Sequence, residues 1–266
     1  MFFGFDDPAF LGSLSIYDPD ALAYIRAVEI ADSQELEPSV RAAINDFVIG
    51  CKTDATWNAI KACCILAGAR TLAGALVPLV GTAPTNFNFL PPSYSRKTGL
   101  LGDGATTYLN SNRNNNADPQ DNAHATVFVT AGPTVTEGAF IGALSSGAAG
   151  GTQIVKNATN NYVARLNSSA TSTIAPFNSP GLGLLGVSRA SSSQYTARVE
   201  GASYTIVNTS NAPVSETIHV FQRNFVGSPI PTDARIAFYS IGKSLNLALL
   251  DARITTLVNA IGAALP

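Results

Sequence analysis

Carboxylates are the side chains through which this chain would most readily do chemistry, because a pair of Asp or Glu residues can cleave a glycosidic bond. A retaining glycoside hydrolase holds two carboxyl groups about 5–5.5 Å apart, and alternate positions of one strand would bring them together. The region 96–243 contains the acids Asp103, Asp118, Asp121, Glu137, Glu200, Glu216 and Asp233. No two of them lie two residues apart on a predicted strand. This spacing predicts that the chain is not an enzyme.

The histidines and a second group of acids do not supply an obvious general acid or base. His124 and His219 lie on predicted strands without a Ser or Cys nucleophile motif beside them. We interpret them as partly exposed strand residues whose nitrogens are hydrogen-bonded. Glu29, Asp32 and Glu35 cluster at the end of a predicted helix, which we interpret as a solvated helix terminus. Catalysis needs acids and bases with matched pKa values, and candidates are few.

An Asn-rich stretch offers oxygen ligands of the kind that calcium prefers. It runs from Asn110 to Asn116 and is followed by Asp118 and Asp121. Its spacing matches no calcium loop, and Asn and Asp are favoured in turns because they tolerate the left-handed backbone conformation. We therefore predict a polar loop and no metal site.

Cysteine is the other residue type that could bind a metal. Cys51, Cys63 and Cys64 all lie in the first quarter of the chain. Adjacent cysteines rarely form a disulfide with each other, and no second Cys pair or nearby His completes a metal-binding quartet. We predict buried free thiols in a helical core, and no cofactor.

A sugar-binding site would need hydrogen-bonding groups and, usually, an exposed aromatic side chain. The Asn-rich stretch could supply the hydrogen bonds, but Trp57, the one tryptophan, lies in the predicted helical part. Tyrosines of the strand-rich region are further stacking candidates, namely Tyr108, Tyr162, Tyr195 and Tyr204. Packing in a core or across strands is the commoner role for each of them, so the sequence assigns no sugar site.

Charge is sparse along the whole chain. It has 16 Lys and Arg against 18 Asp and Glu, and charged residues make up 13% of its 266 residues, about half of the ~25% usual for a soluble domain. The 46% hydrophobic content excludes a disordered chain, and no basic stripe is present to bind nucleic acid. The longest apolar stretch, 59–80, is interrupted by Lys61, Arg70 and Pro78, so we predict buried helices rather than a membrane span.

Apolar residues follow a helical period from residue 18 to about residue 80. Asp18 and Glu37 each precede a proline, and an acceptor followed by Pro at the first helical position is a helix start. Asp54 is expected to cap a third helix. That helix would carry on one face Trp57, Ile60, Cys64 and Ala67.

The period changes to two after a Pro-rich linker at 81–95. Apolar and polar residues alternate at 127–129, 195–199, 218–220 and 236–238, with Gly, Ser, Asn and Pro clusters between these stretches. A closing helix is expected at 244–266, with Asp251, Arg253 and Asn259 on its polar face. We predict a mainly β chain in which an antiparallel sandwich at 96–243 follows a small all-α segment at 18–80 and precedes a C-terminal helix that packs on both.

Three stretches resemble parts of the concanavalin A-like and laminin-G-like sandwiches. The residues Leu100–Leu109 and His124–Val129 resemble the opening strands of such domains, and Arg235–Leu250 resembles their closing strand and short helix. The resemblance implies a jelly-roll sandwich. Because glucanases share this sandwich, we searched for their E-x-D-x-x-E pattern and found that it is absent.

A second resemblance covers almost the whole chain. The stretches 23–29, 43–52, 60–72 and 108–120 are similar to virion structural proteins of bacteriophages, especially cyanophages and marine phages. In those proteins a helical segment precedes a concanavalin-like module. The resemblance implies a structural role on the particle, as a fibre, a decoration or an adhesin, although a fold alone does not fix a function.

Residues 1–17 are predicted to be an N-terminal docking arm, because large apolar side chains precede any helix start. These residues are Phe2, Phe3, Phe5, Phe10 and Leu11. The arm would insert into a partner or a second copy of the chain, or it would fold back on its own helices. A surface with few charges also suits contact with neighbouring subunits, since little charge has to be desolvated.

Together these features predict a non-enzymatic structural component of a phage virion that self-associates and attaches to the capsid or tail. Its partners would be further copies of itself and other virion proteins, without nucleic acid or membrane. One alternative is a glycan-binding receptor module at a tail fibre tip, with a host-surface glycan as its ligand. A second alternative is a polysaccharide-degrading spike.

Overall fold

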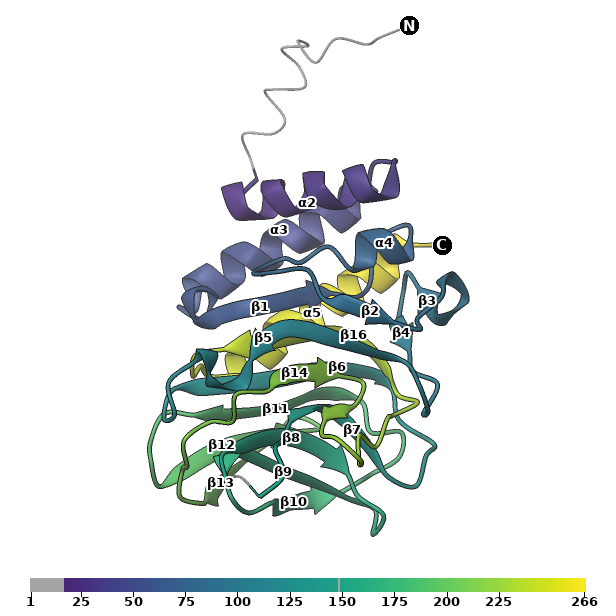
Figure 1. The fold of residues 1–266 in the computed structure, drawn as a ribbon. Helices are drawn as coiled ribbons and strands as arrows, with labels where there is room; N and C mark the ends of the chain where they lie inside the picture. The colour runs from purple at the N-terminus through teal and green to yellow at the C-terminus, as the bar shows by residue number, and fades with distance from the viewer. Residues whose placement is uncertain (1–16, 148) are drawn as a thin grey trace, which may run out of the picture.

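Two antiparallel β-sheets packed face to face form the body of the protein, and a layer of helices lies on one of them (Figure 1). The computed structural model describes residues 17–147 and 149–266. The arrangement confirms the predicted fold class: an antiparallel sandwich with a small helical segment before it and a helix after it. The predicted docking arm and its five apolar residues, Phe2, Phe3, Phe5, Phe10 and Leu11, lie outside the described residues.

The strands divide equally between the two sheets. Sheet A contains, in spatial order, β13 (Ala202–Val207), β12 (Gln194–Val199), β11 (Gly183–Arg189), β6 (Ala123–Ala131), β16 (Arg235–Gly242), β4 (Gly99–Leu101) and β3 (Tyr94–Ser95), with β1 (Ile60–Ile65) also paired to β16. Sheet B contains β10 (Ser172–Pro176), β9 (Asn161–Ser168), β8 (Gly151–Lys156), β7 (Gly138–Ala143), β14 (Thr217–Val220), β5 (Tyr108–Asn114) and β2 (Thr85–Phe87), with the two-residue β15 (Arg223–Asn224) parallel to β7.

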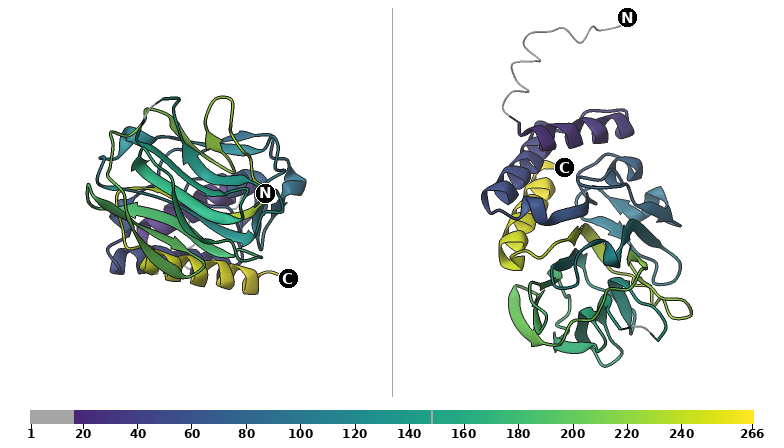
Figure 2. Two further views of the ribbon diagram at one scale, coloured as in Figure 1. Left: turned by 90° about the horizontal axis from the view of Figure 1, so that it is seen from below. Right: turned by 60° about the vertical axis from the view of Figure 1, so that its left-hand side comes forward.

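In the described residues, the three longer helices lie over the outer face of sheet A. The described α-helices are α2 (Pro19–Asp32), α3 (Pro38–Thr53), the short α4 (Leu72–Ala75) and α5 (Leu247–Ala264), and the 3-10 turns η1 (Trp57–Ala59), η2 (Pro91–Ser93) and η3 (Asn115–Ala117) lie in the connections. Helices α3 and α5 pack side by side, and α2 lies farther from the sheets, across α3 (Figures 1 and 2).

Both predicted helix starts are confirmed. The Asp18 side chain accepts a hydrogen bond from the Asp20 N–H at 2.9 Å, so it caps α2 as expected. Helix α3 begins at Pro38, but the Glu37 side chain does not cap it. The Glu37 carboxylate is instead bound by two arginines from another part of the chain, Arg70 and Arg96.

The predicted third helix is wrong. Residues Ile60–Ile65 form strand β1, which pairs with β16 from the far end of the chain, and only η1 remains of the helical turn. The sequence Ile-Lys-Ala-Cys-Cys-Ile is almost entirely buried, because the helices lie on one face of β1 and sheet B on the other. A short apolar run buried on both faces has no period that distinguishes a strand from a helix. Three strands, β1, β2 and β3, lie before residue 96, where the predicted sandwich begins.

Two hydrophobic cores share sheet A. One lies between the sheets, and residues such as Phe140, Tyr162 and Tyr239 contribute to it. The other lies between sheet A and the helices, where Phe47 of α3 meets Phe238 of β16 edge to face at 5.6 Å. This second core explains why β6 and β16 are buried on both faces, whereas β12 shows the predicted alternation.

Helix α5 confirms the predicted closing helix, with two differences. It begins at Leu247, capped by Asn246 rather than Ser244. Asp251, which was predicted on the polar face, is buried and forms an ion pair with Arg198 at 2.7 Å. By length and composition α5 could also cross a membrane, but the apolar stripe that includes Leu250 and Ile254 is buried in the core between the helices and sheet A.

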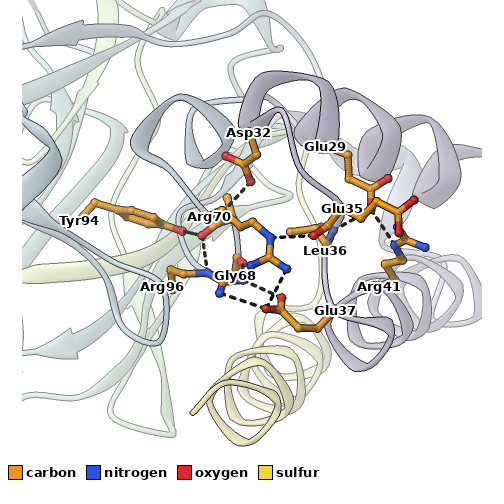
Figure 3. Close-up of polar contacts among 11 residues, drawn as sticks. Glu29, Asp32, Glu35, Leu36, Glu37, Arg41, Gly68, Arg70, Tyr94 and Arg96 are labelled. Atoms are coloured by element: carbon orange, nitrogen blue, oxygen red, sulfur yellow. Dashed lines mark hydrogen bonds and ion pairs between the residues drawn. The ribbon is translucent and has the colours of Figure 1, made fainter. Parts of the chain in front are cut away.

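A polar joint fastens the helical layer to the sandwich (Figure 3). The Glu37 carboxylate accepts hydrogen bonds from both Nη atoms of Arg96, at 3.1 and 2.7 Å, and forms an ion pair with Arg70. Asp32 accepts the backbone N–H groups of Arg70 and Thr71 at 2.6 and 2.9 Å. The Arg96 side chain holds the pKa of Glu37 below its usual value, despite the opposing effect of burial.

The interpretation of Glu29, Asp32 and Glu35 as a solvated helix terminus is wrong for Asp32, which is buried, whereas the Glu35 side chain is 74% exposed. Glu29 accepts the Leu36 N–H and the Arg41 guanidinium, and Glu35 forms an ion pair with Arg41 at 3.1 Å. Asp32 joins the end of α2 to the segment of Arg70 and Thr71, whereas Glu29 and Glu35 bind Arg41 within the helical layer.

Candidate functional site

Three of the sandwich acids, Asp103, Glu200 and Asp233, bind hydrogen-bond donors of loops and strands. Asp103 accepts three backbone N–H groups and two Thr hydroxyls in its own loop. Burial opposes ionisation there, but these bonds outweigh it and leave the pKa of Asp103 well below its usual value. Asp233 binds Thr134 and the Val135 N–H, and Glu200 accepts the Tyr162 hydroxyl at 3.0 Å. These contacts give the acids a structural role.

The Asn-rich stretch is not the loop that we predicted. Residues 108–114 form strand β5 and residues 115–117 the turn η3. Asp118 forms an ion pair with Arg113 at 2.7 Å, which occupies the carboxylate that calcium would need. Within residues 17–147 and 149–266, no three His, Cys, Asp or Glu side chains come together as a metal site.

Both histidines are buried, which corrects the expectation that they are partly exposed. His124 donates from Nδ1 to the Lys243 carbonyl and receives the Ser240 hydroxyl at Nε2. His219 accepts the Gln222 amide at Nδ1, at 3.0 Å. Burial lowers the pKa of each imidazole to about 4, so both rings are neutral at pH 7.

The cysteines are buried and unbridged, as predicted, but only Cys51 lies on a helix. Cys63 and Cys64 lie on β1. Burial raises the pKa of Cys51 to about 11 and that of Cys64 to about 12. Because thiolates are the reactive form, these side chains are inert at neutral pH.

An aromatic stack on the outer face of sheet B is the feature that points to a ligand. Phe87 of β2 and Tyr108 of β5 stack with ring centroids 4.3 Å apart and planes 4° apart. Tyr108 stacks in turn on His219 of β14 at 4.7 Å. Exposure decreases along this aromatic stack: Phe87 is 37% exposed, Tyr108 is half-buried and His219 is buried.

Only one of the predicted stacking tyrosines takes part. Tyr162 and Tyr195 are buried in the core between the sheets, where their hydroxyls bind Glu200 and the Ala164 carbonyl. Tyr204 packs against that core from sheet A. Trp57 lies in the helical layer, with the Lys52 ammonium 5.6 Å from its ring centroid.

Strand register extends the aromatic stack into a polar row across sheet B. His219 lies opposite Gly142 of β7, Gly142 opposite Gln153 of β8, and Gln153 opposite Arg165 of β9. Residues that oppose one another in adjacent strands share a face. The row therefore runs across four strands, about 14 Å from His219 to Arg165 at the usual strand spacing.

The β15 segment completes this row. Arg223 lies opposite Gly142, and a Cβ on Gly142 would come within 3.1 Å of the Arg223 Cβ and 2.9 Å of the Gln153 Cβ. The absence of a side chain at Gly142 therefore lets β15 approach the sheet. The Arg223 Nη1 donates to the Gln153 amide oxygen at 3.0 Å. Beside this polar row, Ile230 packs on an apolar cluster that includes Ala139 and Val155.

The candidate site is therefore an aromatic stack followed by amide and guanidinium groups on one sheet face. The sequence did not reveal it, because Phe87 lies in a segment predicted as a linker, and Tyr108 and His219 are 111 positions apart (219 − 108). No local signal marks Phe87, since residues 85–87 read Thr-Asn-Phe without apolar–polar alternation, and only the pairing of β2 with β5 places it beside Tyr108.

Comparison with known proteins identifies the architecture alone. No protein-family model and no curated protein matches the chain. Among solved structures, the binding domain of botulinum neurotoxin serotype D is similar over 75% of this chain and 50% of its own length, with 11% identity and a TM-score of 0.51. A Trypanosoma rangeli sialidase mutant displaying trans-sialidase activity is similar over 83% of this chain and 39% of its own, at 12% identity and TM-score 0.46.

A smaller structure, the CBM40 domain of Ruminococcus gnavus IT-sialidase bound to α2,3 sialyllactose, matches 50% of this chain and 82% of its own, with 11% identity and a TM-score of 0.38. The chain spans half or less of the length of the toxin domain and of the sialidases it matches. At 11% identity, the similarity to the toxin binding domain establishes a shared fold alone.

Proposed function

We propose that this chain is a non-catalytic carbohydrate-binding module whose site is the outer face of sheet B. The observation that carries the proposal is the aromatic stack of Phe87, Tyr108 and His219, which continues on the same face into the polar row of Gln153 and Arg165. Sugar rings present C–H groups on one face and hydroxyls at their edges. They therefore bind where an aromatic surface adjoins side chains that donate and accept hydrogen bonds.

The electrostatics of the stack support this function. His219 is neutral, because burial lowers its pKa to about 4. The stack is therefore an uncharged surface at pH 7. Gln222 and Arg223 follow His219 by three and four positions in the chain, and Asn110 lies opposite His219 on the neighbouring strand. A ligand that covers Phe87 would thus reach amide and guanidinium groups without a large rearrangement of the sheet.

A direct test is a glycan array followed by calorimetry with any oligosaccharide that binds. Replacing Phe87 with Ala removes the exposed end of the stack, and we expect at least a tenfold loss of affinity at a small cost in stability. Leu90→Ala is the matched control, because Leu90 is an exposed apolar residue, 65% exposed, in the same connection. Absence of any glycan ligand, or equal loss in both variants, would contradict the proposal.

A second candidate function is the virion component that the sequence resemblance implies. It is supported by exposed apolar side chains on a chain with few charges: in the described residues Val226 is 95%, Val207 is 83% and Ile30 is 79% exposed. Such residues suit contact with neighbouring subunits. Immunogold labelling of intact particles tests the location. Light scattering after size-exclusion chromatography tests self-association, and a monomer would contradict it.

A further inference from the structure

Two arginines on the outer face of sheet B lack the acidic partners that most other arginines of the protein have. Ion pairs in the described residues engage six arginines, namely Arg41, Arg70, Arg96, Arg113, Arg198 and Arg253. Arg165 and Arg223 form no ion pair with any described residue. The acid whose charge acts on Arg223 is Glu137, which is exposed and beyond ion-pair distance.

These two arginines flank one amide. Arg165 lies opposite Gln153 across β8 and β9, and Arg223 donates to the Gln153 amide oxygen at 3.0 Å from the other side. Arg223 is held in place by the Ser228 carbonyl at 2.8 Å and the Ser228 hydroxyl at 2.8 Å. Two positive charges therefore stand beside each other over a buried neutral side chain.

Arg165 is incompletely bonded. Its Nη1 donates to the Ser169 carbonyl at 3.1 Å, but its buried Nε has no hydrogen-bond partner in the described residues. Space beside it depends on Gly151, where a Cβ would come within 3.1 Å of the Arg165 Nη2. Burial, together with the charge of Arg223, lowers the pKa of Arg165. An anion at this point would offset both effects.

From this geometry we infer that Arg165 and Arg223 bind the anionic group of an acidic sugar, a carboxylate or a sulfate, whose neighbouring sugar rings lie on the aromatic stack. The inference rests on the function proposed above, since it names the class of carbohydrate. Planar guanidinium groups bind two-oxygen anions through paired hydrogen bonds, which neutral sugars cannot match. Five strand spacings separate the exposed ring of Phe87 from Arg165, about 24 Å at the usual distance between strands, which is the span of an oligosaccharide of several sugar rings.

Titration calorimetry with three oligosaccharides of equal length tests this: a uronate oligomer, its carboxyl-reduced neutral form and a sulfated form of the neutral oligomer. We expect at least tenfold tighter binding of one or both acidic forms than of the neutral form, with a preference that weakens in high salt. The stronger acidic ligand identifies the anion. Equal binding of all three would overturn the inference and leave the proposed function intact, whereas no binding of any would contradict both.

Variants separate a local contact from general charge. Arg165→Met and Arg223→Met should each remove most of the preference for acidic over neutral oligosaccharides. Arg165→Lys should keep only part of that preference, because lysine retains the positive charge but lacks the paired N–H donors of a guanidinium. Arg26→Met removes the same charge from an exposed position on α2 and should leave the preference unchanged. If all four variants bind alike, with unchanged unfolding midpoints, the inference is wrong.

Discussion

At the scale of single residues, the two histidines make stability depend on pH. His124 and His219 are both buried, and burial lowers the pKa of each to about 4 from its ordinary value near 6.5. The unfolded chain therefore binds protons between those values while the folded protein does not. Protonation in that range favours the unfolded state.

We predict that the free energy of unfolding falls as the pH is lowered from 7 to 5, by about 2 kcal/mol for each histidine. Acids with lowered pKa values, such as Asp103 and Glu37, lose their contribution only at lower pH, so this window isolates the histidines. Urea unfolding at each pH measures the effect. His219→Phe keeps a ring in the aromatic stack and removes one titrating group. The fall in its free energy of unfolding between pH 7 and 5 should therefore be about half of that of the unsubstituted protein. An unfolding free energy that does not change between pH 7 and 5 would contradict the prediction.

At the scale of elements, the contact between β1 and β16 depends on Gly242. A Cβ at this position would lie 2.1 Å from the Ala59 carbonyl oxygen and 2.8 Å from the Lys61 nitrogen. Both are backbone atoms, so no side chain can move to relieve the clash. Pairing of β1 with β16 thus requires glycine here, although its backbone conformation does not.

Replacing Gly242 with Ala should therefore destabilise the protein by about 2–3 kcal/mol or more, because overpacking against backbone forces β1 to shift. Gly262→Ala is the matched control. A Cβ at Gly262 meets nothing within 4 Å, and alanine in a helix is favoured over glycine by up to about 1 kcal/mol. Urea midpoints of the two variants should move in opposite directions. The prediction fails if Gly242→Ala unfolds at the same midpoint as the unsubstituted protein.

Elements with a clear local signal could be predicted from the sequence. Asp18 and Pro38 mark helix starts that the structure confirms, and the alternation at 195–199 matches the burial of β12. Strand β1 could not be predicted, because its residues are buried on both faces and the strand that pairs with it, β16, lies more than 150 positions away in the chain.

The candidate site was less predictable than the fold. Tyr108 was one of several possible stacking residues, and nothing local distinguishes it from Tyr162, which is buried in the core. Its neighbours Phe87 and His219 come from strands on either side, so only the register of sheet B brings the three rings together. The same holds for Arg165 and Arg223, which meet across Gln153.

At the scale of the whole molecule, the helical layer and the sandwich share one core. Phe128, Leu184 and Phe238 of sheet A pack in the same cluster as Phe47 of α3 and Leu250 of α5. The polar joint at Glu37 links the same two parts. Neither part can bury its apolar surface without the other, so they should unfold together.

We predict a single unfolding transition. Circular dichroism at a helical wavelength, which follows the helical layer, and the NMR amide signals of sheet B, which follow the sandwich, should give the same midpoint in urea. Glu37→Ala, which leaves Arg70 and Arg96 without their shared partner, should lower both midpoints equally. Two separate midpoints in the unsubstituted protein would show that the helical layer and the sandwich are independent domains.

The position of β16 also bears on how the protein is made. Strand β16 lies between β6 on one side and β4 and β1 on the other, so the centre of sheet A is missing until residue 242 has emerged from the ribosome. Helix α5, which seals the second core, follows it. Strands β1 and β6 are synthesised earlier, and the edges that pair with β16 stay unpaired until β16 has been made. We expect nascent chains that stop before residue 235 to require a chaperone to stay soluble.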